Sequence, residues 1–138
     1  MLFRSILTEQ VAKTAEITID FQEIKLPRLP EGVETCLYRI TQEATHNAIK
    51  YSKSSLITIQ LFDSENLVEL IISDNGQGFD LPAIRKTLGG SGLKNMQARA
   101  ELLNGSFKIQ SKIGKGTTIK VAIPLEKNVA MDRLIRRK

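Results

Sequence analysis

The chain has 138 residues, of which 41% are hydrophobic and 25% are charged, and its formal net charge is +5. This length is typical of one domain, and the composition excludes collagen, a coiled-coil rod and a wholly disordered chain. No apolar run approaches the roughly 20 residues that a membrane-spanning helix needs. The single cysteine, Cys36, can form neither an internal disulfide nor a metal site alone, so we expect a reducing, cytoplasmic environment.

Part of the positive charge is concentrated at the C-terminus, at Arg133, Arg136, Arg137 and Lys138. We interpret residues 126–138 as a solvated basic tail. Only 5% of the residues are aromatic, and no pattern of stacking side chains accompanies the basic ones. We therefore expect no nucleic-acid partner.

The first half of the chain shows strand-like and helical patterns in turn. Apolar and polar residues alternate over Ile17–Phe21, which predicts a strand, and two prolines with a glycine predict a loop over 26–32. Residues 33–51 change to helical spacing. The apolar positions of that helix are Leu37, Ile40, Ala44, Ala48 and Tyr51. Two strands joined as a hairpin follow, over Leu56–Phe62 and Leu67–Asp74.

The second half begins with a polar segment, 75–92, whose length and glycines indicate a functional loop or lid. A second helix is predicted over Leu93–Leu103 and ends at Asn104–Gly105. Two further strands, Phe107–Ser111 and Thr117–Ile123, flank a glycine turn. Strands in hairpins mixed with helices predict an α+β fold, with one antiparallel or mixed sheet and helices on one face.

A polar stripe accompanies the apolar face of the helix over 33–51. Glu43, Asn47 and Lys50 are spaced by helical turns, so they lie together at the rim of the helix–sheet interface. A carboxylate, an amide oxygen and an ammonium there can serve as a base, a ligand for a hard cation and a phosphate contact. A solvated helix flank with a Glu–Lys pair is the plainer alternative.

The segment Asp74-Asn-Gly-Gln-Gly-Phe-Asp80 ends the second hairpin strand. Asp74 shares a strand face with Val68 and Ile72, so its carboxylate should meet solvent or a donor such as the exocyclic amine of a base. Gly76 and Gly78 allow a positive φ and close approach of the backbone to a ligand. An ordinary Asn-Gly turn is the alternative.

Two more glycine motifs follow. Gly89-Gly-Ser-Gly-Leu93 directly precedes a predicted helix, where bare N–H groups form an anion site. A hinge with Ser91 as helix cap is the alternative. Gly114-Lys-Gly116-Thr117 is the fourth candidate motif. Taken alone, it can equally be interpreted as a plain hairpin turn.

In this order, the four motifs resemble the ATP-binding domain shared by bacterial histidine kinases, gyrase, MutL and Hsp90. The resemblance spans residues 33–124. The segments LYRITQEATHNAIKYS and GGSGLKNMQARAELLNG are most similar to the sensor kinases typified by nitrate/nitrite sensors. The resemblance implies a two-layer sandwich of the Bergerat type, with a mixed sheet of about five strands packed on three helices.

The resemblance also implies roles for individual residues. Asn47 would ligate Mg²⁺, Glu43 would be the general base and Lys50 would approach the phosphates of ATP. Asp74 would bind the adenine amino group. The remaining positions, at the adenine pocket, the lid end and the last glycine motif, are Gly76, Gly78, Gly90, Ser91, Gly92, Leu93, Gly116 and Thr117.

The resemblance further implies that residues 1–16 end a dimerisation-helix connector and that 17–125 form the ATP-binding catalytic domain. The only histidine, His46, lies inside the Mg²⁺ motif and points away from the apolar stripe. The phosphorylated histidine is therefore expected outside this chain, in the dimerisation and phospho-acceptor domain of a parent kinase, for relay to a response regulator. We expect an isolated monomer and leave open an inner-membrane anchor in the parent.

Two other functions share this fold. A stand-alone anti-sigma serine kinase or switch protein is the alternative, and it would need its own complete N-terminus and a surface for a sigma factor. A DNA-handling ATPase of the gyrase or MutL kind is disfavoured by the short segment between Gly78 and Gly90.

Overall fold

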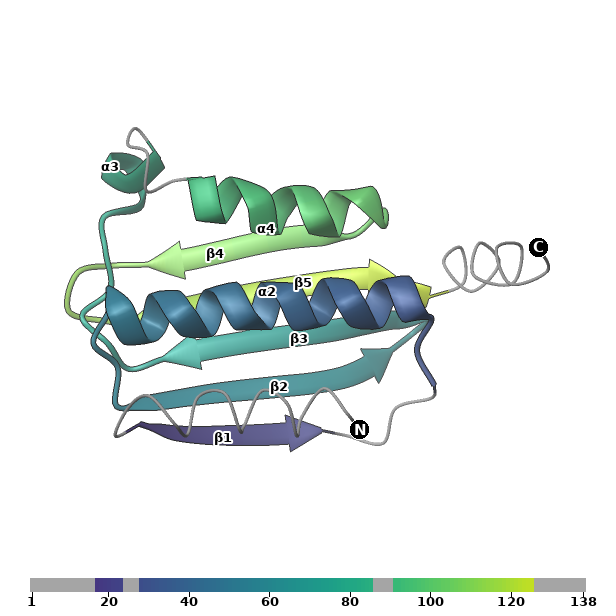
Figure 1. Ribbon diagram of the computed structural model, residues 1–138, viewed down its shortest axis with the longest axis horizontal. Coiled ribbons are helices and arrows are strands. Elements are labelled where there is room, and N and C mark those ends of the chain that lie inside the picture. The colour runs from purple at the N-terminus through teal and green to yellow at the C-terminus, as the bar shows by residue number, and fades with distance from the viewer. Residues whose placement is uncertain (1–16, 24–27, 86–90, 126–138) are drawn as a thin grey trace.

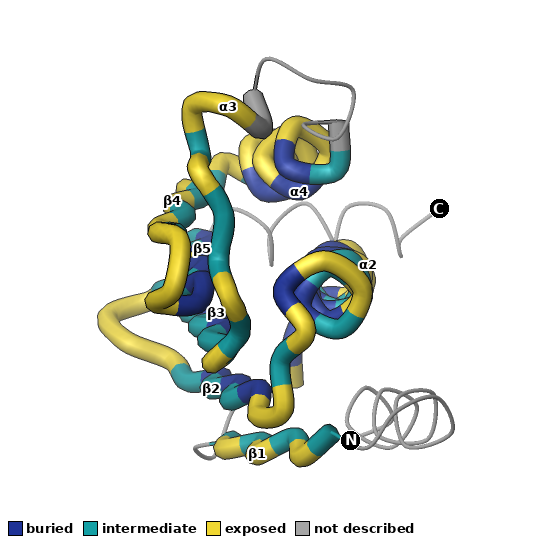
Figure 2. Tube along the Cα trace, turned by 90° about the vertical axis from the view of Figure 1, so that its left-hand side faces the viewer, coloured by how far each residue is buried: buried dark blue, intermediate teal, exposed yellow. Residues whose placement is uncertain are grey.

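Five strands form one mixed sheet, and two helices, α2 and α4, cover one of its faces (Figures 1 and 2). The computed structural model describes residues 17–23, 28–85 and 91–125. The strands are β1 (Thr18–Glu23), β2 (Leu56–Ser64), β3 (Leu67–Asp74), β4 (Ser106–Ser111) and β5 (Thr117–Pro124). The helices are α2 (Glu31–Lys50), α3 (Leu81–Arg85) and α4 (Ser91–Leu102). This arrangement confirms the predicted α+β sandwich with a five-stranded mixed sheet.

The order of strands in the sheet is β1-β2-β3-β5-β4. β1 and β2 are parallel, because α2 provides the long crossover that a parallel pair needs, and the other three pairs are antiparallel. In the β3–β5 pair, the last residue of β3, Asp74, lies opposite the first residue of β5, Thr117. The register of this pair therefore places two predicted site residues side by side.

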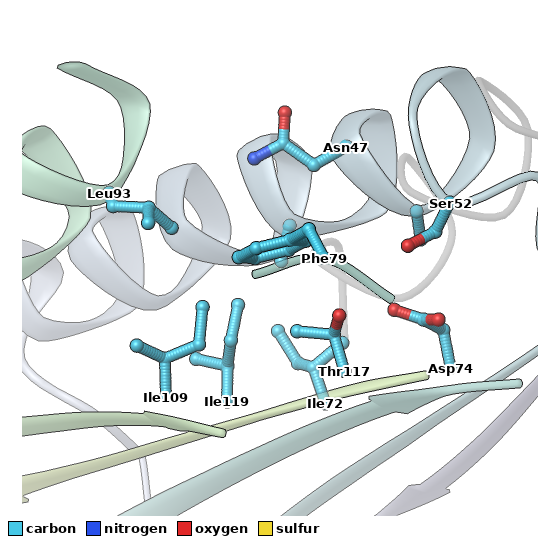
Figure 3. Close-up of a pocket in the computed structure, with 11 residues that line it drawn as sticks. Asn47, Ser52, Ile72, Asp74, Phe79, Leu93, Ile109, Thr117 and Ile119 are labelled. Carbon is cyan, nitrogen blue, oxygen red and sulfur yellow. The ribbon is translucent and has the colours of Figure 1, made fainter. Parts of the chain in front are cut away.

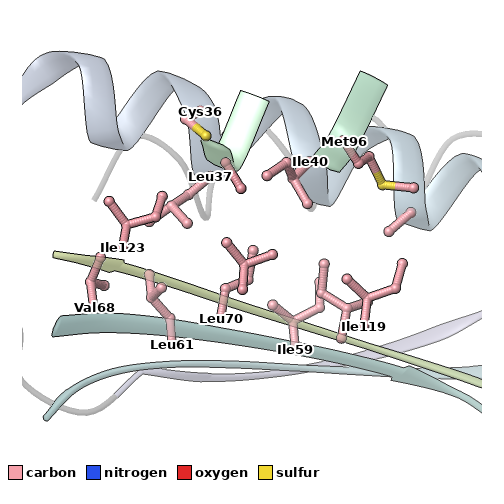
Figure 4. Packing of buried hydrophobic residues seen from close by; sticks show 14 of the residues in the cluster. Cys36, Leu37, Ile40, Ile59, Leu61, Val68, Leu70, Met96, Ile119 and Ile123 are labelled. Carbon is pink, nitrogen blue, oxygen red and sulfur yellow. The ribbon is translucent and has the colours of Figure 1, made fainter. Parts of the chain in front are cut away.

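A continuous apolar core fills the space between sheet and helices (Figure 4). Val68, Leu70 and Ile72 of β3 all face it, as the strand period of two predicts, and none is more than 3% exposed. From the helical layer, Ile40 of α2 and Met96 of α4 pack against the same core, and each is at most 1% exposed. The helical spacing of the apolar residues thus matches the face that α2 and α4 bury.

Cys36 packs in this core from α2. Burial raises the pKa of its thiol to about 11, an effect that the positive charge of Arg99 partly offsets. The thiol is therefore protonated at neutral pH and packs as a small apolar group.

Tyr51 is an exception to the predicted apolar face. Its side chain is 59% exposed, because α2 ends at Lys50 and the chain turns there to bury Ser52 instead, at 3% exposure. The Lys50 ammonium lies over the Tyr51 ring, 5.4 Å from its centroid. The prediction that Tyr51 belongs to the core face was therefore wrong.

Several boundaries differ from those predicted. α2 begins at Glu31, inside the predicted loop, and α3 lies inside the predicted lid segment, with Pro82 in its first turn, where a missing N–H is tolerated. α4 ends at Leu102, one residue before the predicted end. The predicted stop at Asn104–Gly105 is confirmed, because Asn104 adopts a φ of 60° and the Gly105 N–H donates to the Ala100 carbonyl at 2.9 Å.

The predicted connector over 1–16 and the tail over 126–138 lie outside the described residues. Within the described ranges, every helix is too short or too polar to cross a lipid bilayer.

We predict opposite stability effects for two glycine-to-alanine changes. A Cβ at Gly105 would lie 2.7 Å from the Ala122 carbonyl oxygen and 3.0 Å from Ile123 Cγ1, so Gly105→Ala should lower the free energy of unfolding by about 1–3 kcal/mol. Gly32 lies in α2 with nothing within 4 Å of such a Cβ, so Gly32→Ala should raise it by about 0.4–1 kcal/mol. Urea denaturation measures both, and equal effects would contradict the packing described at Gly105.

Candidate functional site

A small pocket with about 20 Å³ of free volume lies between α2, the end of β3, the start of β5 and the start of α4 (Figure 3). Its apolar wall consists of Ala44, Ala48, Ile72, Leu93, Ile109 and Ile119. Its polar side chains are Asn47, Ser52, Asp74 and Thr117. The Phe79 ring lies in its middle, between Asn47 and the sheet (Figure 3). A mostly apolar cavity with a few polar groups is typical of a small-molecule site.

Four predicted site residues meet in this pocket: Asn47, Asp74, Leu93 and Thr117. Each comes from a different element, namely α2, β3, α4 and β5. The fold therefore gathers one residue from each of the four motifs around one cavity.

The carboxylate of Asp74 is held in place at the end of β3. Its Oδ1 atom accepts a hydrogen bond from the Gly76 N–H at 2.8 Å, and the residue is only partly exposed. The same loop returns close to the next motif, since a Cβ at Gly116 would lie 2.2 Å from the Asp74 carbonyl oxygen. Gly116 also has a φ of +76°, so both sterics and backbone conformation require glycine there.

The loop after Asp74 is anchored to the chain that follows α2. Asn75 Oδ1 accepts hydrogen bonds from the N–H groups of Ser55 and Leu56, both at 3.0 Å. The Gln77 N–H and its Nε2 donate to the carbonyl oxygens of Ser52 and Tyr51, each at 2.8 Å. These bonds fix the pocket rim on the side of Asp74, so Asn75 and Gln77 have a structural role.

Gly76 and Gly78 need to be glycine for different reasons. Gly78 has a φ of +66°, and a Cβ there would lie 2.1 Å from the Lys112 carbonyl oxygen. Gly76 has no positive φ, but its Cβ would lie 2.4 Å from the Ser52 carbonyl oxygen. At Gly76, close approach of the protein's own backbone alone excludes a side chain.

The polar stripe of α2 divides between the pocket and its surroundings. Asn47 lines the pocket, whereas Glu43 lines a neighbouring groove between α2 and α4. Gly92 lies close to both side chains, because a Cβ there would lie 2.6 Å from Glu43 Oε1 and 3.9 Å from Asn47 Nδ2. Lys50 lines neither cavity and lies over the ring of Tyr51.

His46 is exposed and lies in that groove beside Glu43, together with Arg39 and Arg99. Arg39 Nη1 donates to Gln42 Oε1 at 3.4 Å, its neighbour on the same helix. The groove is therefore a polar, solvent-facing surface, which agrees with the predicted exposure of His46.

The phosphate motif is described in part. Gly90 lies outside the described residues, and Ser91 begins α4, two residues before the predicted start of that helix. Gly92 and Leu93 therefore lie in the first turn of α4, and Leu93, at 8% exposure, packs into the pocket wall. Gly92, in this first turn, lies close to both Glu43 and Asn47, so the start of α4 adjoins the pocket and the neighbouring groove.

Three residues at the site were not predicted: Ser52, Phe79 and Ser111. Ser52 and Phe79 line the pocket, and Ser111 lies beside it, hydrogen-bonded to its cross-strand partner Thr117. Ser111 could have been found from strand register, since it lies opposite Thr117 across the predicted hairpin. Ser52 and Phe79 carry no such signal, because their positions depend on how the loops fold back.

Comparisons with known proteins agree on one family. A family model described as "Histidine kinase-, DNA gyrase B-, and HSP90-like ATPase" matches residues 32–127. The chain is 41% identical over 114 residues to the signal transduction histidine-protein kinase/phosphatase DegS of Bacillus subtilis, covering 80% of this chain and 30% of that protein. It is 41% identical over 112 residues to the sensor protein VraS of Staphylococcus saprophyticus, covering 81% and 31%.

Solved structures share the fold. The histidine kinase domain of the Erythrobacter litoralis EL346 blue-light activated histidine kinase matches with a TM-score of 0.78 at 14% identity, covering 95% of this chain and 63% of that one. The Acinetobacter baumannii histidine kinase AdeS matches with a TM-score of 0.68 at 18% identity, covering 87% and 60%. This chain spans about a third of the length of the curated relatives that it matches. With the family model covering most of its residues, it belongs to the histidine kinase-, DNA gyrase B- and HSP90-like ATPases.

Proposed function

We propose that this chain is the ATP-binding catalytic domain of a sensor histidine kinase, which transfers the γ-phosphoryl group of ATP to a histidine outside the chain. The observation that carries the proposal is that Asp74 and Asn47, from separate motifs, line one pocket. Family membership and the relatives' names support it. The same names favour a sensor kinase over the anti-sigma serine kinase considered as the alternative.

The adenine ring is assigned to the apolar end of the pocket. Asp74 offers a carboxylate, held by Gly76, to the exocyclic amine of the base. Ile72, Ile119 and Phe79 supply apolar surface for the ring faces. The ring of Phe79 shares this space (Figure 3), so it has to stack on the base or move aside when ATP binds.

The phosphates are assigned to the end where α4 begins. The amide oxygen of Asn47 suits Mg²⁺, a hard cation that keeps water ligands and takes phosphate oxygens. Within the described ranges, no three His, Cys, Asp or Glu side chains gather as metal ligands, which agrees with a metal held mainly by ATP and water. When bound, Mg²⁺ would neutralise charge on the phosphate oxygens.

The chain's own groups can position the transfer. The N–H groups of Ser91 and Gly92, in the first turn of α4, have no acceptor within the helix and can bind phosphate oxygens. The carboxylate of Glu43 lies beside Gly92, where it can accept a proton from an attacking histidine. The Lys50 ammonium lies over the Tyr51 ring, but its side chain is long enough to move away and contact the phosphates of ATP.

The remaining parts of the proposal concern the parent protein. Residues 1–16 would lead from the dimerisation and phospho-acceptor domain, 17–125 would form the catalytic domain, and 126–138 a basic tail. We further propose a sensor of the nitrate/nitrite type, a response regulator as the final acceptor and a cytoplasmic location for this domain.

Calorimetric titration with Mg-ATP tests the assignment of the base. Asp74→Asn should weaken ATP binding about tenfold or more, because a carboxamide can turn its NH₂ toward the adenine amine, leaving two donors face to face. Asp63→Asn makes the same change at an exposed position of β2 and should bind ATP like the wild type. Unchanged affinity in Asp74→Asn would overturn the proposed function.

The metal assignment is tested by titrating ATP with Mg²⁺ and then with EDTA. The wild type should bind ATP more tightly with Mg²⁺, whereas Asn47→Ala should lose most of that difference and keep its affinity in EDTA. Asn95→Ala, an exposed amide on α4, serves as the control. A full Mg²⁺ effect in Asn47→Ala would show that Asn47 is not a ligand.

A further inference from the structure

Ser111 lies beside the pocket, opposite Thr117 on the same face of the sheet, and its single hydroxyl group makes three hydrogen bonds. Its Oγ accepts from the Phe79 N–H at 2.9 Å, donates to the Gly116 carbonyl oxygen at 3.2 Å and lies 2.7 Å from Thr117 Oγ1. It does not itself line the pocket. Ser111 therefore joins the loop that follows Gly78 to the first residue of β5.

The direction of the Ser111–Thr117 bond follows from counting protons. A serine hydroxyl has one proton and can accept two hydrogen bonds. The Phe79 N–H can only donate and the Gly116 carbonyl can only accept, so the Ser111 proton goes to Gly116. All three contacts are then satisfied only if the hydroxyl of Thr117 donates to Ser111.

This direction determines what Thr117 offers to a ligand. With its proton directed at Ser111, Thr117 Oγ1 presents lone pairs alone to the pocket. The carboxylate of Asp74 is also an acceptor, and Asp74 and Thr117 are cross-strand partners on the same face of the sheet, where neighbouring Cβ atoms lie about 4.5–5.5 Å apart. Two adjacent acceptors thus form the polar edge of the pocket.

We propose that Ser111 is a positioning residue that sets nucleotide specificity, by holding Thr117 as an acceptor beside Asp74. The inference rests on the proposed function and deepens it. A pair of acceptors suits the exocyclic amine of adenine, which carries two N–H groups. Guanine presents a carbonyl oxygen at the same ring position, and that oxygen would face two acceptors.

Removal of the Ser111 hydroxyl should relax this selection. In Ser111→Ala, the Thr117 hydroxyl is free to rotate and donate into the pocket. We expect the Kd for Mg-ATP to rise about five- to tenfold, which is the effect of one lost hydrogen bond. We expect Mg-GTP to be affected less, so that the preference for ATP over GTP falls about fivefold.

The experiment measures Mg-ATP binding by calorimetry and Mg-GTP binding by competition, for the full chain and three variants. Ser111→Thr keeps the hydroxyl and should restore both affinities to within about twofold. Ser73→Ala is the matched control, because the Ser73 and Thr118 hydroxyls lie 3.3 Å apart on the same part of the sheet but outside the pocket. It should leave the ATP preference unchanged, while thermal melts compare the stability of the variants.

A merely structural role for Ser111 would lower both affinities by the same factor and leave the preference unchanged, which would overturn the inference. An equal shift in Ser73→Ala, or no recovery in Ser111→Thr, would also overturn it. If Asp74→Asn abolishes ATP binding while Ser111→Ala keeps the full preference, the proposed function stands and only the inference fails. If the wild-type chain binds no ATP, both fail.

Discussion

The antiparallel register between β3 and β5 is the constraint on which the pocket depends. It places Asp74 opposite Thr117 and, through the β4–β5 pair, Thr117 opposite Ser111. A slip of β3 by one residue against β5 would turn Asp74 to the opposite face and expose the apolar row of Val68, Leu70 and Ile72. The free energy of burying that row therefore also fixes the register that positions the polar groups of the pocket. The geometry of the ligand site thus depends on the packing of the core.

Backbone contacts at the sheet end add rigidity to this arrangement. Gly76, Gly78 and Gly116 each lie where a Cβ would meet a carbonyl oxygen at less than 2.5 Å, so three separate segments pack backbone against backbone. Asn75 also accepts hydrogen bonds from the N–H groups of Ser55 and of Leu56, the first residue of β2. The loop after Asp74 is thus fixed on both sides before any ligand arrives, which lowers the entropy cost of binding.

The periodic parts of the chain could be predicted from sequence, and the loop contacts could not. The face shared by Val68, Ile72 and Asp74 follows from a period of two, and the adjacency of Asn47 to the core follows from helical spacing. Tyr51 shows where periodicity fails, since an element's end is set by the chain that follows it. The positions of Ser52 and Phe79, the short helix α3 and the reason for a glycine at Gly76 depend on tertiary contacts that no local pattern encodes. The four sequence motifs therefore located the site, but they did not reveal the residues whose tertiary contacts fix its geometry.

The two ends of the pocket differ in how freely their side chains move, and this difference matches the two tasks proposed for them. Asp74, Thr117 and Ser111 are short side chains at strand ends, joined to backbone or to one another by hydrogen bonds. They have few rotamers to lose, so they can discriminate between ligands at low entropic cost. Glu43 and Lys50 are long side chains on the outer flank of α2, beside a solvent-facing groove or over a surface ring. Groups that must meet a phosphate and an incoming acceptor benefit from that reach, whereas groups that select a base would lose selectivity from it.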